Sequence, residues 1–152
     1  MFSSGTGGAG AATSVLSDHV RWTGFAPPPT PAGNYSFQSH SCKLTSDGET
    51  GAFACELSGQ LFPGLAPGQF SGSLVLQSAD GTTSGSFTLT PTSTPGTSKL
   101  KGTGTENDAA EPGQPAQSYP CRLGGRMLFT QYPDGSYSIT GTLTVRESST
   151  RP

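Results

Sequence analysis

Three Asp-Gly pairs, at positions 47–48, 80–81 and 134–135, constrain this chain more than any other feature of its sequence. Each pair lies between two segments in which apolar and polar residues alternate. An Asp-Gly pair supplies the positive φ angles that a tight β-hairpin turn requires, and between such segments it is the strongest short hairpin signal. The chain is therefore predicted to form antiparallel hairpins.

The alternating segments begin after residue 34 and continue almost to the end of the chain. Such alternation is typical of a strand with one apolar and one solvated face. An all-β fold of about seven or eight strands follows, either a closed, hairpin-rich antiparallel barrel or a two-sheet sandwich. The sequential hairpins favour an up-and-down barrel. The apolar positions are Tyr35, Phe37, Phe53, Cys55, Leu57, Leu61, Phe70, Leu74, Leu76, Phe87, Leu89, Met127, Phe129, Tyr137, Ile139, Leu143 and Val145.

The turn chemistry also predicts strand register. A two-residue loop at the second Asp-Gly pair places Leu74 opposite Phe87. A three-residue loop, in which proline precedes the third pair, places Leu123 opposite Val145. Both registers bring apolar side chains to one face of the sheet, as a stable sheet requires.

The 152 residues fit a single β domain, residues 34–152, preceded by an N-terminal arm, residues 1–33. Residues 1–14 are mostly Gly, Ala, Ser and Thr, and they are predicted to be flexible. Five large apolar residues between positions 15 and 25 then form an anchor, which fits either a helical turn or a strand. The proline-rich segment 27–31 is predicted to be a stiff strap.

Four aromatic residues are the candidate ligand-binding or docking residues: Trp22, Phe25, Tyr35 and Phe37. Small barrels can hold one small molecule in their interior. In that interpretation the aromatic groups line the cavity and residues 15–31 form a lid over it.

The three cysteines allow one intrachain bridge. A four-residue hairpin loop places Cys42 directly opposite Cys55, with Leu44 facing Phe53, and this spacing permits a disulfide. A two-residue loop would offset the two cysteines. Cys121 is left over, and its position in an apolar strand favours burial over reactivity.

No metal, cofactor or catalytic residue is predicted. His40, Cys42 and Cys55 lack the ligand spacing of recognisable zinc sites. The aspartates of the three Asp-Gly pairs serve the turns. Glu106 falls in the polar segment 106–118, which is predicted to be an exposed loop. No two carboxylates have a spacing that indicates an acid/base pair.

Charge and hydropathy argue against a nucleic-acid partner and against a membrane-spanning helix. Eight basic residues are scattered along a chain of net charge −2, so no basic patch for nucleic acid is expected. No apolar segment approaches the length of a membrane-spanning helix, and the N-terminus lacks the layout of a signal peptide. Only 12% of residues are charged, and Ser and Thr supply the polarity. This composition favours an extracellular or virion-exposed protein, although the compartment stays open.

Two functions remain. The first is a non-enzymatic binding or structural module of the extracellular or virion-surface type. It would bind a protein partner or self-assemble through the N-terminal arm, or use the 106–118 loop. The alternative is a small β-barrel that binds or cyclises an apolar small molecule under the lid. As an enzyme it would be a cofactor-independent cyclase or isomerase that acts by orienting its substrate.

Overall fold

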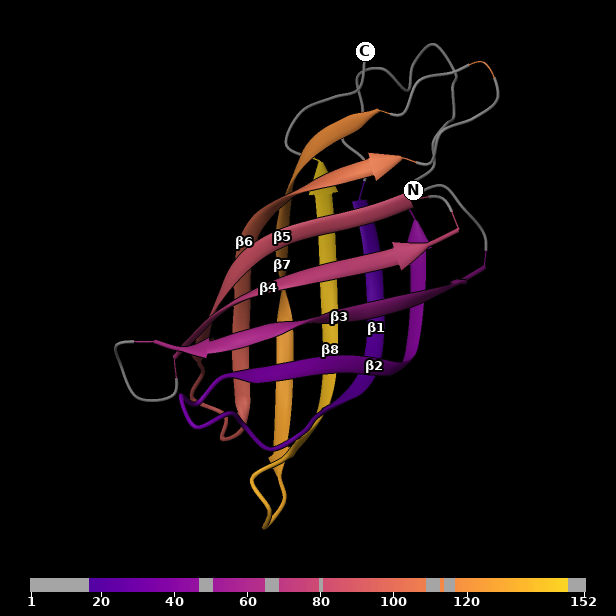
Figure 1. Ribbon diagram of the computed structural model, residues 1–152. Helices are drawn as coiled ribbons and strands as arrows, with labels where there is room; N and C mark the ends of the chain where they lie inside the picture. Colours follow the sequence, from indigo (N-terminus) through magenta and orange to yellow (C-terminus); the bar gives the residue numbers. More distant parts are fainter. Residues whose placement is uncertain are drawn as a thin grey trace.

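Eight antiparallel strands close into one barrel in the computed structural model of this chain, which describes residues 17–46, 51–64, 69–79, 81–108, 113 and 117–147 (Figure 1). Each strand pairs with the next along the chain, and the last pairs with the first. The prediction of an all-β, hairpin-rich barrel is confirmed, and the sandwich is excluded. The strands are β1 (Ser17–Ala26), β2 (Tyr35–Ser46), β3 (Phe53–Pro63), β4 (Phe70–Ser78), β5 (Gly81–Pro91), β6 (Thr97–Asp108), β7 (Ser118–Gln131) and β8 (Tyr137–Glu147).

Strand β1 is part of the barrel wall, which corrects the predicted boundary at residue 34. It is antiparallel to β2 along one edge and to β8 along the other. Val20 and Trp22 point into the interior, while Arg21 faces solvent. Residues 17–26 therefore belong to the barrel, because this strand closes the sheet. Self-assembly was predicted through the arm of residues 1–33, of which residues 1–16 lie outside the described residues.

Apolar side chains occupy the middle of the barrel. Several inward positions are glycines, and large rings fill the space that those glycines leave. A Cβ on Gly59 would lie 2.7 Å from the Phe37 ring. Glycine at such positions allows a sheet to bend and a ring to pack against backbone. The buried core comprises Val20, Trp22, Ala26, Phe37, Cys42, Leu44, Leu57, Leu61, Leu74, Leu76, Phe87, Leu89, Leu100, Cys121, Leu123, Met127, Ile139, Leu143 and Val145.

The β7–β8 hairpin has the predicted register. Leu123 pairs with Val145, and the turn lies at residues 132–136. The backbone amide of Ser136 donates to Asp134 Oδ1 at 2.9 Å, and its hydroxyl donates to the same oxygen at 2.5 Å. These hydrogen bonds lower the pKa of the Asp134 carboxyl. Asp134 therefore has the structural role in the turn that its sequence position indicated.

The predicted register of the β4–β5 hairpin is wrong by two residues. Ser78 pairs with Gly81, and Phe87 lies opposite Gly72 instead of Leu74. The physical reason is steric, since the Phe87 ring lies where a Cβ on Gly72 would come within 2.7 Å of it. A shift of two residues keeps the same side chains on the inner face.

Cys42 and Cys55 form a disulfide between β2 and β3, with their Cα atoms 5.1 Å apart. The predicted pairing of Leu44 with Phe53 is confirmed, and Cys121 is a free, buried cysteine. Among the described residues, no helix is long and apolar enough to cross a membrane.

Candidate functional site

Four aromatic rings cluster at the end of the barrel where β2, β4 and β8 begin and β7 ends. We call this cluster, Tyr35, Phe70, Phe129 and Tyr137, the aromatic mouth. The Tyr137 ring centroid lies 5.3 Å from that of Tyr35 and 5.6 Å from that of Phe129, and Tyr35 lies 6.1 Å from Phe70. All three contacts are edge-to-face, the arrangement that aromatic quadrupoles favour. Each ring comes from a strand terminus, and barrel closure brings these termini together.

A cavity of about 330 Å³ lies at the aromatic mouth. The β5–β6 connection forms one wall, and the backbone amide of Phe129 donates to the Gly96 carbonyl at 2.8 Å, which attaches that connection to β7. None of the described residues that line the cavity is Asp, Glu, Lys, Arg or His. The lining comprises the aromatic mouth together with Leu61, Pro91, Thr92, Thr94, Pro95, Gly96, Thr97, Ser98 and Gln131. An aromatic cavity with a few hydroxyl and amide groups suits a neutral molecule.

The Tyr35 phenol of the mouth stays protonated at physiological pH, because its pKa is raised. Burial raises the pKa of Tyr35, and the neighbouring Tyr137 phenol raises it further. A protonated phenol can both donate and accept a hydrogen bond. The mouth therefore provides polar groups without introducing charge.

Only Tyr35 of the four predicted ligand-binding residues lies in the mouth. Trp22 and Phe37 are 4% and 3% exposed, and their rings stack in the core with centroids 5.6 Å apart. Phe25 points outward and is 42% exposed, because Gly24 and Ala26 take the inward positions of β1. Local alternation could not place these rings, since the barrel interior is shared by strands from the whole chain.

Sequence reasoning missed Phe70, Phe129 and Tyr137 as site residues. Each had been recognised as an apolar strand position, and each lies close to a strand terminus. In an up-and-down barrel, alternate strand ends meet at the same rim. Aromatic residues close to those strand ends were therefore the sequence signal that could have identified the site.

The predicted lid is also corrected. Residues 17–26 form a strand with hydrogen-bonding neighbours on both edges, so this part of the segment cannot open over the barrel. Residues 27–34 connect β1 to β2, and they contain a turn in which the Gly33 amide donates to the Thr30 carbonyl at 2.8 Å.

The opposite end of the barrel holds three buried carboxylates, which we call the acidic end: Asp18, Glu106 and Glu147. Glu106 was predicted to be in a loop, but β6 extends to Asp108 and directs Glu106 inward. Each carboxylate continues the inward alternation of its strand, a signal that sequence reasoning did not use. The Ser46 hydroxyl donates a hydrogen bond to Asp18.

Cys121 lies among these carboxylates. Burial and the negative charge of Glu106 raise the pKa of its thiol to about 12, with smaller contributions from Glu147 and Asp18, against the lowering effect of a hydrogen bond from the Gly104 backbone. Because the thiolate is the reactive form of cysteine, this thiol is chemically inert in the folded protein at neutral pH.

We expect folding stability to fall as the pH rises from about 9 to about 12. The folded protein holds the Cys121 proton more tightly than the unfolded chain, whose thiol has a pKa of 9.0. The slope contributed by this one group approaches about 1.4 kcal/mol per pH unit. Urea unfolding at a series of alkaline pH values should show this fall in the free energy of unfolding. The Cys121→Ala variant should show a smaller slope between the thiol pKa of the unfolded chain and that of the folded protein. An equally steep slope in the variant would contradict this assignment.

The described residues contain no group of three or more His, Cys, Asp and Glu side chains arranged to hold a metal ion. The sulfur atoms of Cys42 and Cys55 are bonded to each other, so they cannot act as thiolate ligands together with His40. The His40 ring instead lies 3.2 Å from the Thr23 hydroxyl on the outer surface.

Comparison with known proteins finds no matching family model, no matching curated protein and no matching solved structure.

Proposed function

We propose that this protein is a binding module that holds a small, neutral, apolar molecule in the aromatic mouth. The observation that carries the proposal is the cavity of about 330 Å³ between aromatic rings of four strands, with no charged side chain among its described lining residues. Cavities of this size and composition at the mouth of a β-barrel are common ligand sites.

Chemical complementarity defines the ligand class. Ring edges and faces offer apolar contact, while Tyr35, Ser98 and Gln131 contribute hydroxyl and amide groups to the wall. A charged ligand would lose its hydration without gaining an ion pair in this cavity. A flat, aromatic or cyclic molecule with a single polar group fits these conditions best.

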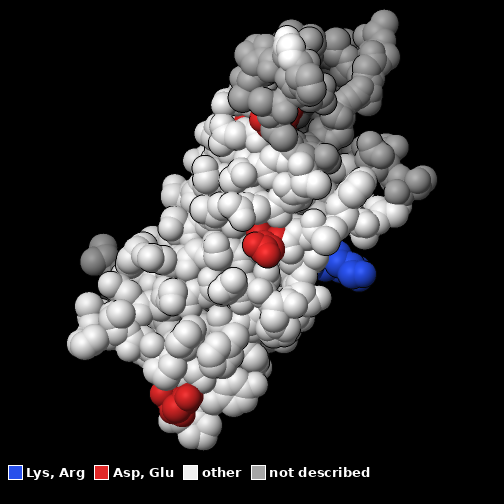
Figure 2. Space-filling model, turned by 45° about the vertical axis from the view of Figure 1, so that its right-hand side comes forward, with Lys and Arg blue, Asp and Glu red and all other residues white. Residues whose placement is uncertain are grey.

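An extracellular or otherwise oxidising compartment is part of this proposal. The Cys42–Cys55 disulfide supports it, because such bonds persist mainly in oxidising environments. The face in Figure 2 carries few charged side chains, in agreement with the low share of charged residues in the sequence.

Binding can be tested with N-phenyl-1-naphthylamine, a neutral aromatic dye whose fluorescence rises in apolar sites. We expect saturable, one-to-one binding by the intact protein. Phe129→Ala should weaken that binding about 10-fold or more, because it removes one aromatic wall of the cavity. Native mass spectrometry should show one retained dye molecule per chain.

Tyr132→Ala is the matched control. Tyr132 lies in the β7–β8 turn near the mouth but is 45% exposed and does not line the cavity. Its replacement should leave dye affinity unchanged. Equal loss in both variants, or dye binding that never saturates, would show adsorption to exposed aromatic groups and would refute the proposal.

A further inference from the structure

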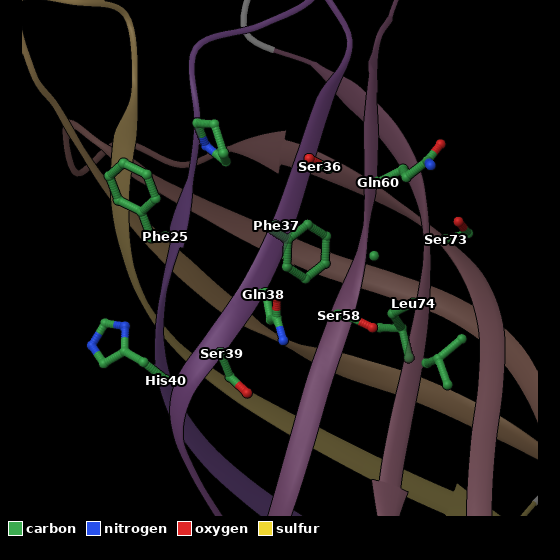
Figure 3. A pocket seen from close by; sticks show the side chains of 13 residues that line it. Phe25, Ser36, Phe37, Gln38, Ser39, His40, Ser58, Gln60, Ser73 and Leu74 are labelled. Carbon is green, nitrogen blue, oxygen red and sulfur yellow. The ribbon is translucent and has the colours of Figure 1, made fainter.

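A groove lies outside the barrel, on the outer face of β1–β4. We call this surface the outer groove and define it by its exposed polar residues Ser36, Gln38, Ser58, Gln60 and Ser73 (Figure 3). The groove encloses about 820 Å³. Gln38 and Ser58 lie in its middle, Phe25 and His40 on one side, and Ser73 on the other.

A β-bulge shapes the groove. Thr23 pairs with Ser41 and Gly24 pairs with Ser39, which leaves His40 as an extra residue in β2. A bulge bends its strand and redirects side chains, and bulges occur frequently beside functional sites. The β2–β3 ladder also shifts register here, and the Ser39 hydroxyl accepts a hydrogen bond from the Leu57 amide at 2.9 Å.

The groove offers hydrogen-bonding groups without fixed charge. None of its described lining residues is Asp, Glu, Lys or Arg. The side chains of the five residues that define the groove make no hydrogen bond to other described residues, so they are available to a ligand. An amide provides two donors and an acceptor, and a hydroxyl provides one donor and two acceptors. Such a set matches a ligand with several neighbouring hydroxyl groups.

Exposed aromatic groups and a neighbouring depression extend this surface. Phe25 is 42% exposed at one side of the groove, where its ring can pack against the C–H face of a sugar. A depression over β3–β6 shares Ser73 with the groove, and its lining includes Phe62, Thr88, Lys101 and Thr103. Together the two surfaces cross six strands, and the five spacings between these strands, at roughly 4.8 Å each, give a path of about 24 Å.

We propose that the outer groove binds a neutral oligosaccharide chain. The length of the path suits several linked sugars better than one, and the hydroxyl and amide groups match their hydroxyl groups. A peptide that adds to a sheet requires an unpaired strand edge, whereas each of the eight described strands has a neighbour on both sides in the closed barrel. A nucleic acid requires a cluster of basic residues, whereas the described lining of the groove has none and that of the depression has only Lys101. This proposal does not depend on the aromatic mouth.

The test is a two-dimensional amide NMR titration of the full chain with cellohexaose, xylohexaose, mannohexaose and maltohexaose. At least one neutral chain should shift the amide signals of the five groove residues. The Gln38→Ala/Gln60→Ala double variant should weaken that binding about 10-fold or more, since it removes two amide groups. Phe25→Ala should weaken it as well.

Gln77→Ala is the matched control, because Gln77 is exposed on β4 but does not line the groove. The affinity of the Gln77→Ala variant for the oligosaccharide should equal that of the unaltered protein. The double variant should still bind N-phenyl-1-naphthylamine, which distinguishes failure of the groove from failure of the mouth. The absence of groove shifts with all four chains would overturn the proposal. Two other results would also overturn it. One is an unchanged affinity of the double variant for the neutral oligosaccharide, and the other is binding of tri-galacturonic acid as tight as that of the neutral oligosaccharide.

Discussion

Replacing Gly141 with alanine is expected to lower the free energy of unfolding by about 2–3 kcal/mol. Gly141 faces the barrel interior, opposite Trp22 on β1 and Met127 on β7. A Cβ at this position would lie 2.4 Å from Trp22 Nε1 and 2.6 Å from its Cε2. Trp22 cannot move away easily, because it is buried and stacked on Phe37.

A double-mutant cycle checks the cause of this destabilisation. Trp22→Phe removes the indole atoms nearest to the added methyl group, so Gly141→Ala should cost much less in that background. Gly124→Ala is a matched control, because nothing lies within 4 Å of its Cβ position. Urea unfolding of the single and double variants measures the change in the free energy of unfolding at each step of the cycle. If Gly141→Ala cost the same in both backgrounds, contact with Trp22 would not be the reason.

Reducing the Cys42–Cys55 disulfide is expected to cost about 3 kcal/mol, the typical value for a closed loop of about 15 residues. The two cysteines are 13 positions apart in the sequence. Without the bond, the unfolded chain gains conformational freedom. The folded chain also loses a covalent tie beside the bulge, where the β2–β3 ladder shifts register. Cys42→Ala/Cys55→Ala should show the same direction of effect.

Urea unfolding with and without dithiothreitol measures this contribution. The denaturation midpoint of the unaltered protein should fall on reduction, whereas that of the double variant should not respond to dithiothreitol. Cys121→Ala should retain the response, because Cys121 takes no part in the bond. A midpoint that is insensitive to reduction would contradict a stabilising disulfide.

Much of the fold was predictable because it depends on local patterns. Alternating apolar residues identified most of the strands from residue 35 onward, but not β6, and the turn at residues 132–136 set the pairing of Leu123 with Val145. The spacing of Cys42 and Cys55 permitted the disulfide that the structure contains. The β4–β5 register was not predictable from its turn, because the packing of Phe87 against Gly72 determined it.

The candidate sites depend on contacts between distant segments. Tyr35 was predicted as a site residue, but its neighbours Phe70, Phe129 and Tyr137 come from other strands. In the same way, Glu106 meets other carboxylates at the acidic end only because the strands are staggered in a closed sheet. No pattern within one strand carries this information.

Local sequence patterns were sufficient for the strand class, most strand positions and the inward phase of most strands, because side-chain alternation and turn chemistry act over a few residues. The closed fold was needed to establish that β1 (Ser17–Ala26) completes the wall, which rings share the mouth and where the outer groove lies. Closure of a barrel sets the stagger between all strands together. Residues far apart in the chain therefore become neighbours through a constraint that local propensities do not express.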